Sequence, residues 1–294
     1  GGNLAIMGMV LELEEDNMVA VAKMLIDTGM AEIQDYNYLR LDPALPAYLR
    51  LSINREAFAQ LEGAWAGAMR QLVGFLYQQK FQDSKLANNL TLLELPNLLA
   101  LLDWLADLLN RDIASAEMVS GTAGKIEQLL EYLNRPSALD SAVQLRAASA
   151  ALIPEWGKTR FENERLLIER LLGAGQLQPA YEKARALLEK AKTSAYKGAD
   201  YDLGIAHFML GRVLETGGQA APALDVLIEA QQLFEAIHDN ESAAQMAAVT
   251  LTEQADCLTA LGRLDEAAET YNENIKRAEK QKDSRQVAVG KFQL

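Results

Sequence analysis

The sequence predicts an all-α protein of stacked helical hairpins, with a small α/β module at its N-terminal end. Three segments of the second half, residues 171–180, 214–223 and 258–267, align without gaps. Their central glycines are 43 and 44 residues apart, from 175 to 218 and from 218 to 262. A fixed period of this length is typical of repeated helical pairs, each of which buries its apolar side against its neighbours.

Each aligned segment has the residues expected where one helix ends and its partner begins. The central glycine tolerates the left-handed backbone that commonly follows a helix. Pro179 and Pro222 come near the start of the second helix, where a missing N–H costs little. Ala180, Ala223 and Ala267 are small, so we expect paired helices to touch there. The pattern predicts repeats over residues 159–294, the last one truncated, since 284–294 reads as the opening of another helix.

The large and small residues of the middle repeat resemble those of a tetratricopeptide (TPR) repeat. They stand at Leu210, Gly211, Leu214, Ala223, Leu227 and Ala230. The period is longer than the usual length of about 34 residues, and it resembles the extended variety found in large signalling ATPases. The resemblance is strongest over residues 161–281. It implies a TPR-like helical solenoid that binds a protein or peptide partner and is not itself an enzyme.

In this family the first helix of each repeat lines a concave groove. When the frame is carried over from Gly211, the groove candidates are spaced three, four and three residues apart, so each set shares one helix face. They are Glu162, Arg165, Glu169 and Leu172, then Ile205, Phe208, Arg212 and Glu215, and then Val249, Thr252, Asp256 and Thr259. We expect Phe208 to be an apolar anchor in the groove and a basic ligand to be favoured. The alternative is a solvated face without a partner.

Residues 52–158 read as an irregular, divergent helical region. The expected helices span 55–79, 91–109, 113–133 and 138–153, and prolines separate them. The run from Glu94 to Leu105 resembles the element that follows the winged-helix part of STAND-type signal-transduction NTPases, although Leu101 stands where that element has alanine. This resemblance implies a larger regulatory protein whose nucleotide-binding domain lies upstream of this chain.

Residues 1–51 differ in character from the rest. Residues 17–27 place apolar side chains on one side of a helix, and residues 29–33 and 38–41 alternate like two short strands. Residues 35–37 would form the turn between these strands. Residues 41–50 resemble the strand exit of the winged-helix module, so we expect its last helix and its hairpin wing here.

Winged helices often bind DNA, so a nucleic-acid-binding regulator is the alternative function. Residues 1–50 contain eight acidic side chains and three basic ones, and the whole chain has a net charge of −13. DNA-binding surfaces are normally basic, and an acidic surface repels phosphate backbones and anionic lipid. Charge therefore favours a protein partner. Self-association, through the solenoid or with missing domains of the parent chain, stays open.

The sequence predicts no catalytic residue, no cofactor and no metal site. The segment 121–125 lacks the earlier glycine and the following Ser or Thr of a phosphate-binding loop, so we interpret it as a loop that links helices. His207 falls at a core position and His238 near the end of a second helix, and neither has a spaced metal partner. We expect Cys257 to pack as a small apolar group.

The composition also indicates the cellular environment of the protein. A single cysteine cannot form an internal disulfide, so a reducing, cytoplasmic environment fits best. The most apolar run, residues 98–109, contains two aspartates and is shorter than the roughly 18 residues of a membrane span. We also expect the chain to be a fragment of a longer polypeptide.

Overall fold

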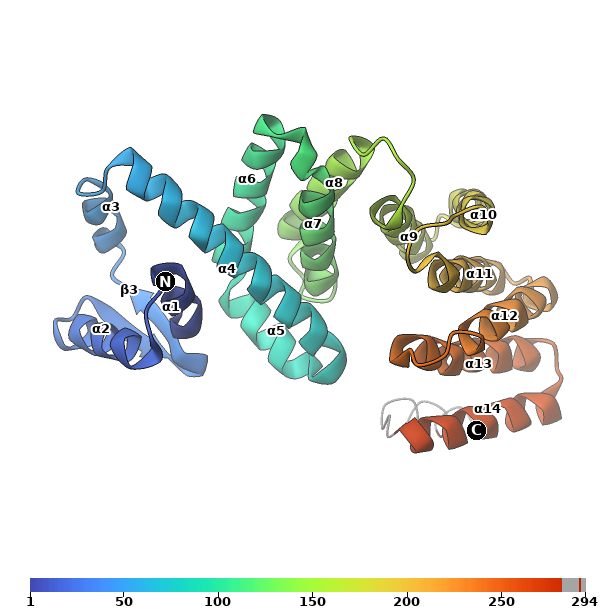
Figure 1. Ribbon diagram of the computed structural model, residues 1–294. Helices are drawn as coiled ribbons and strands as arrows, with labels where there is room; N and C mark the ends of the chain where they lie inside the picture. Colours follow the sequence, from blue (N-terminus) through green and yellow to red (C-terminus); the bar gives the residue numbers. More distant parts are fainter. Residues whose placement is uncertain (282–290, 292–294) are drawn as a thin grey trace. The chain divides into compact units, whose positions relative to one another are not determined.

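The computed structural model describes residues 1–281 and residue 291, and it divides into two compact units. Unit 1 comprises Gly1–Ile153 and unit 2 comprises Pro154–Leu294 (Figure 1). Over the described residues there are fourteen α-helices and one sheet of three short strands. The predicted all-α class with a small α/β part is therefore confirmed. The predicted further helix at 284–294 lies almost wholly outside the described residues.

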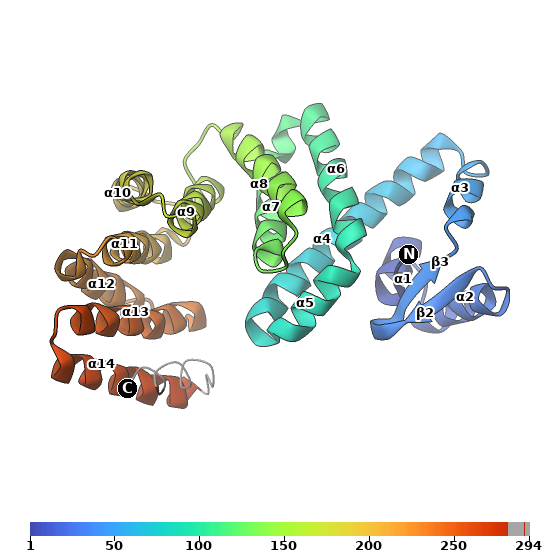
Figure 2. The ribbon, with the colours of Figure 1, turned by 180° about the vertical axis from the view of Figure 1, so that it is seen from behind.

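Unit 1 begins with a small α/β module. Its elements are β1 (Gly2–Asn3), α1 (Leu4–Leu11), α2 (Glu15–Asp27), β2 (Ala31–Gln34), β3 (Tyr38–Leu41) and α3 (Ala44–Arg50). The sheet is antiparallel in the order β1-β3-β2, and Ile33 lies opposite Leu39. Helix α2 lies against the β2–β3 hairpin (Figure 2). The alternation of residues 29–41 thus predicted the hairpin correctly.

Strand β1 lies outside the region where strand was expected, about residues 30–42, so that expectation is wrong. It pairs with the free edge of β3, with Gly2 opposite Leu39 and Asn3 opposite Tyr38. The side chain of Asn3 accepts a hydrogen bond from the N–H of Ala5, which caps α1, and donates one to the carbonyl of Tyr36. A two-residue strand has no periodicity, so only these tertiary bonds define it.

The rest of unit 1 is a bundle of five helices around one apolar core. They are α4 (Arg55–Gln82), α5 (Ser84–Leu93), α6 (Leu95–Arg111), α7 (Ala116–Leu130) and α8 (Pro136–Ala151). The single helix predicted over 91–109 is wrong, because the chain breaks at Glu94. Pro96 is the second residue of α6 and has no N–H to continue the hydrogen bonds of α5.

The segment 121–125 lies inside α7, so the interpretation as a helix-linking loop is wrong. Small residues there, among them Ala123, are buried and allow α7 to approach its neighbours closely. One turn further on, Glu127 forms a buried ion pair with Arg146 of α8. The charged pair is shielded from water and hydrogen-bonded, as buried charges require.

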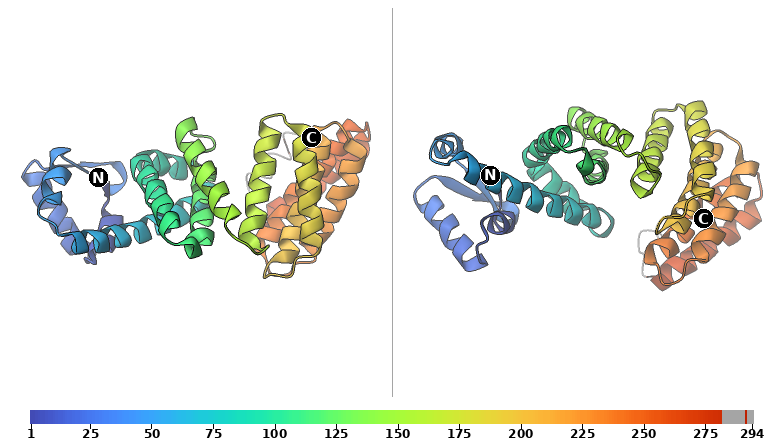
Figure 3. Two further views of the ribbon diagram at one scale, coloured as in Figure 1. Left: turned by 90° about the horizontal axis from the view of Figure 1, so that it is seen from above. Right: turned by 45° about the horizontal axis from the view of Figure 1, so that its top comes forward.

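The described residues of unit 2 form three helical hairpins packed side by side (Figure 3). Their helices are α9 (Lys158–Gly173) with α10 (Leu177–Lys192), α11 (Ala199–Thr216) with α12 (Ala220–Glu235), and α13 (Glu241–Ala260) with α14 (Leu264–Gln281). Gly175, Gly218 and Gly262 have φ values of 69°, 75° and 73° at the three hairpin turns. The N–H groups of these glycines and of the next residues return to the last helical turn, as in a Schellman motif.

The predicted contact positions between paired helices are confirmed. Ala180, Ala223 and Ala267 are buried in the core of unit 2. A β-carbon added at Gly211 would lie 2.6 Å from Leu227, and one added at Gly204 would lie 2.7 Å from the ring of Phe234. Helices α11 and α12 therefore approach so closely that only glycine fits at these two positions.

Among the described residues, no helix is both long enough and apolar enough to cross a membrane.

Candidate functional site

The candidate residues all lie on the first helices of the three hairpins, as the repeat frame predicted, but their exposure differs. Ile205 and Phe208 are only 8% and 7% exposed and belong to the core of unit 2. The expectation that Phe208 is an exposed apolar anchor is therefore wrong. The ring of Phe208 lies beneath Arg212, whose guanidinium carbon is 5.8 Å from the ring centroid. This cation–π contact stabilises the Arg212 guanidinium over the ring.

On α9, the three charged candidates form ion pairs with one another. Arg165 Nε lies 2.7 Å from Glu162 Oε2, and Arg165 Nη1 lies 2.8 Å from Glu169 Oε1. Lys158 joins the same chain, with its Nζ 3.0 Å from Glu162 Oε1. Burial alone would raise the pKa of Glu162, but Arg165 and Lys158 outweigh it and lower that pKa below its usual value. This part of the face is a network of ion pairs.

Lys158 also ties α9 to α11. Its ammonium pairs with the buried carboxylate of Asp202, which accepts a second hydrogen bond from the hydroxyl of Tyr196 at 2.8 Å. Burial alone would lower the pKa of Lys158, but Glu162 and Asp202 raise it above its usual value. Lys158 and Asp202 were not among the candidates, because their partnership joins residues 44 positions apart and leaves no local sequence signal.

Between α11 and α13, the described residues place one arginine near three carboxylates. Arg212 Nε lies 3.6 Å from Glu253 Oε1, and the two side chains are 39% and 24% exposed. Burial raises the pKa of the Glu253 carboxyl, Asp256 and Glu215 raise it further, and Arg212 opposes them. The Glu253 carboxylate thus has one guanidinium and two further carboxylates near it. We call Arg212, Glu215, Glu253 and Asp256 the acidic cluster.

Glu253 was missed by the sequence reasoning. It stands one position after Thr252, so it falls outside a frame carried over by strict spacing from Gly211. The signal that could have found it is its spacing of three residues from Asp256, which puts both carboxylates on one helix face.

Two of the candidates on α13, Thr252 and Asp256, contact α14. Asn274 Nδ2 donates to Thr252 Oγ1 at 2.7 Å, and the hydroxyl of Tyr271 donates to Asp256. Thr259 is exposed and donates to the carbonyl of Ala255 on its own helix. The position of Asp256 is therefore fixed by α14. Its carboxylate also raises the pKa of Glu253.

Two reactive side chains are in the core. Cys257 is fully buried, and burial, followed by the Glu215, Glu253 and Asp256 carboxylates, raises the pKa of its thiol to about 12. His207 is 7% exposed, and its Nδ1 lies 3.1 Å from Glu229 Oε2. Burial lowers the pKa of His207 although Glu229 opposes the shift. The prediction that both residues pack in the core is confirmed.

Among the described residues, no group of three or more His, Cys, Asp or Glu side chains is arranged to hold a metal ion.

Comparison with known proteins bears on the fold. No protein-family model and no curated protein matches the chain. Among solved structures, the chain is similar to a Rap protein complexed with competence and sporulation factor, with a TM-score of 0.53 and 15% sequence identity. The match covers 83% of this chain and 72% of the Rap chain. The likeness shows a TPR-like helical-repeat fold, as the sequence predicted.

Proposed function

We propose that this chain is a non-catalytic binding module, and that the first helices of unit 2 hold a peptide segment of a partner protein. The ligand is expected to place a Lys or Arg side chain against the acidic cluster. The observation that carries the proposal is the gathering of carboxylates between α11 and α13, where Arg212 pairs with Glu253 while Glu215 and Asp256 lie near.

The physical argument concerns the partly buried carboxylate of Glu253. Partly buried carboxylates interact more strongly with an added charge than exposed ones do, because less water screens them. The raised pKa of Glu253 reports that its ionised form is disfavoured in the free protein. A bound cation would relieve that cost, so part of its binding free energy comes from the cluster itself.

The similar Rap structure is consistent with this role, since it holds a separate factor. As a finer part of the proposal, we infer that the chain belongs to a larger cytoplasmic, STAND-like regulatory protein. Helix α2 leads directly into the β2–β3 hairpin, the order in which a winged-helix module ends. The buried cysteine supports a reducing compartment.

The test compares two dye-labelled peptides that differ only in charge, one rich in Lys and Arg and one rich in Asp and Glu. Fluorescence anisotropy should show binding of the basic peptide to the whole chain. The double variant Glu215→Gln/Glu253→Gln should weaken this binding by about tenfold or more. The charge-matched control is Glu182→Gln/Asp225→Asn, which removes two exposed carboxylates from the second helices α10 and α12, and it should change affinity less than about twofold.

Equal loss in both double variants would show that net charge alone drives binding, and the proposed site would be wrong. Preference for the acidic peptide would also contradict it. Circular dichroism of each variant establishes that the helical fold is retained, so a loss of binding is not a loss of folding.

A further inference from the structure

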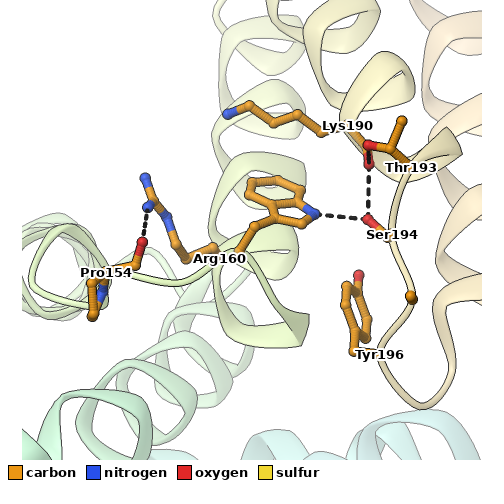
Figure 4. Close-up of a pocket in the computed structure, with 8 residues that line it drawn as sticks. Pro154, Arg160, Lys190, Thr193, Ser194 and Tyr196 are labelled. Carbon is orange, nitrogen blue, oxygen red and sulfur yellow. Dashed lines mark hydrogen bonds between the residues drawn. The ribbon is translucent and has the colours of Figure 1, made fainter.

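A cavity of about 560 Å³ at the C-terminal end of α10 has polar groups that are bonded within the protein (Figure 4). Trp156 Nε1 donates to Ser194 Oγ at 2.8 Å, and Ser194 Oγ donates to the carbonyl of Lys190 at 2.8 Å. Arg160 Nη1 donates to the carbonyl of Pro154 at 3.4 Å. These bonds stabilise this end of the α9–α10 hairpin.

A second cavity, of about 430 Å³, lies between α10, α11 and α12. The last residue of α10, two residues of α11 and three residues of α12 line it: Lys192, Leu203, His207, Glu229, Gln232 and Leu233. Spacings of three and four residues put the side chains from each helix on one face. The volume is in the range of small-molecule sites in proteins, and no lining residue belongs to the acidic cluster.

The imidazole of His207 has a polar atom that the protein leaves without a hydrogen bond. Nδ1 is buried and forms no hydrogen bond with any described residue. Glu229 Oε2 is within ion-pair distance, at 3.1 Å, but not in hydrogen-bonding geometry. Buried polar atoms of this kind are uncommon in folded proteins. The Glu229 side chain is 62% exposed, so it can turn toward a ligand and open access to Nδ1.

Charges of both signs meet at this imidazole. Burial lowers the pKa of His207, Glu229 raises it and Lys192 lowers it, so both charged groups are close enough to act on the same ring. Lys192 Nζ also lies 2.9 Å from Glu189 Oε1. An ammonium has three N–H donors, so this bond leaves two of them for a ligand. A ligand with one charge would be attracted by one of the two groups and repelled by the other, whereas a zwitterion would be attracted by both.

We propose that this cavity binds a free α-amino acid with an aliphatic side chain. The ammonium of the ligand donates hydrogen bonds to the Glu229 carboxylate and to His207 Nδ1. The carboxylate of the ligand accepts from Lys192, and its side chain lies against the two leucines of the lining. Charge-assisted hydrogen bonds supply orientation, and the apolar contact supplies buried area. This site is separate from the proposed peptide-binding face, so the two proposals can fail independently.

The experiment uses the two histidines of the chain, His207 and the exposed His238. Their imidazole Cε1–H signals are followed by NMR at constant pH in the whole chain labelled with ¹³C-histidine, and His238→Gln assigns them. The probe is L-leucine, up to about 10 mM, which is ten times a Kd of about 1 mM. L-Leucine should shift the His207 signal in a saturable manner and leave the His238 signal in place.

Three relatives of L-leucine test each part of the recognition. Isoamylamine lacks the carboxylate, 4-methylpentanoate lacks the ammonium, and glycine lacks the apolar side chain. Each of the first two should bind about tenfold more weakly than L-leucine or worse, because it loses one charge-assisted contact and retains the repulsion. Glycine should give no shift at the same concentration.

Two variants test the charged groups of the cavity. Glu229→Gln and Lys192→Gln should each weaken L-leucine binding by about five- to tenfold. Both side chains are exposed, so the fold should be retained, which circular dichroism checks. The matched controls are Glu182→Gln and Lys183→Gln, which remove the same charges from exposed positions on α10 outside the cavity and should leave binding unchanged.

The proposal is overturned if L-leucine leaves the His207 signal unmoved or shifts His238 equally. It is also overturned if isoamylamine or 4-methylpentanoate binds as tightly as L-leucine, because recognition would then not depend on a zwitterion. Equal losses in the cavity variants and in their controls would likewise contradict it.

Discussion

Substitution of Gly211 by alanine tests the close approach of α11 and α12. The added β-carbon would lie 2.6 Å from Cγ and Cδ2 of Leu227, whereas ordinary contacts begin at 3.4 Å. Leu227 cannot move away easily, because its side chain is fully buried and its carbonyl accepts a hydrogen bond from Gln254 of α13. Overpacking of this kind costs about 1–3 kcal/mol.

Alanine is also a better helix former than glycine, by roughly 0.5–1 kcal/mol. We therefore expect Gly211→Ala to lower the free energy of unfolding by about 0.5–2 kcal/mol. Urea unfolding followed by circular dichroism measures this value. Gly173→Ala, in the same unit with open space around the added carbon, is the control and should change stability by less than about 0.5 kcal/mol.

Measuring Gly211→Ala in the Leu227→Ala variant separates the effect of the steric clash from the effect of helix propensity. Leu227→Ala alone should cost about 2–5 kcal/mol. Once that side chain is absent, Gly211→Ala should become neutral or stabilising, because the atoms it meets are gone. If Gly211→Ala is as stable as the wild type, or equally harmful with and without Leu227, the reasoning about this contact is refuted.

Three further predictions rest on single residues. Ala223→Leu should destabilise the chain by about 1–3 kcal/mol because Ala223 is fully buried between helices, and an unchanged melting temperature would contradict the repeat frame. Cys257 should react with a thiol reagent at neutral pH only after denaturation, since it is buried and its pKa is raised to about 12; fast labelling of the native chain would disprove this. The raised pKa of Glu253 means that the folded state binds its proton more tightly than the unfolded state, so its contribution to stability falls as pH rises from about 4 through the folded pKa. Glu253→Gln should remove that fall in urea unfolding measured over this pH range, and an unchanged pH profile would contradict it.

The hairpin turns of unit 2 were predictable because their cause is local. Gly175, Gly218 and Gly262 occupy left-handed positions that most other residues avoid. The sequence therefore has a glycine at each turn. Pro96 also indicated the break at Glu94. The apolar pattern continues on both sides of the break, however, and it favoured a single helix. Local signals thus define where helices end more reliably than periodicity does.

The burial of Phe208 was not predictable in the same way. Helical spacing gives the face on which a side chain lies, but not how far neighbouring helices and long side chains extend over that face. Arg212 lies over the Phe208 ring one turn later, and the ring is closed within the core. The repeat frame therefore located the face correctly, whereas the division of that face into core and surface depended on tertiary packing.

In the proposed function, the selectivity of the candidate face for a peptide would come from the positions where the repeats differ. Glu169, Arg212 and Asp256 occupy equivalent positions in successive repeats, so the charge there alternates from negative to positive to negative. On α9 this position is neutralised within its own helix by Arg165. On α11, Arg212 is opposed by the carboxylates of α13. A cationic side chain would therefore gain more between α11 and α13 than along α9, and a peptide bound to this face would be positioned by that one contact.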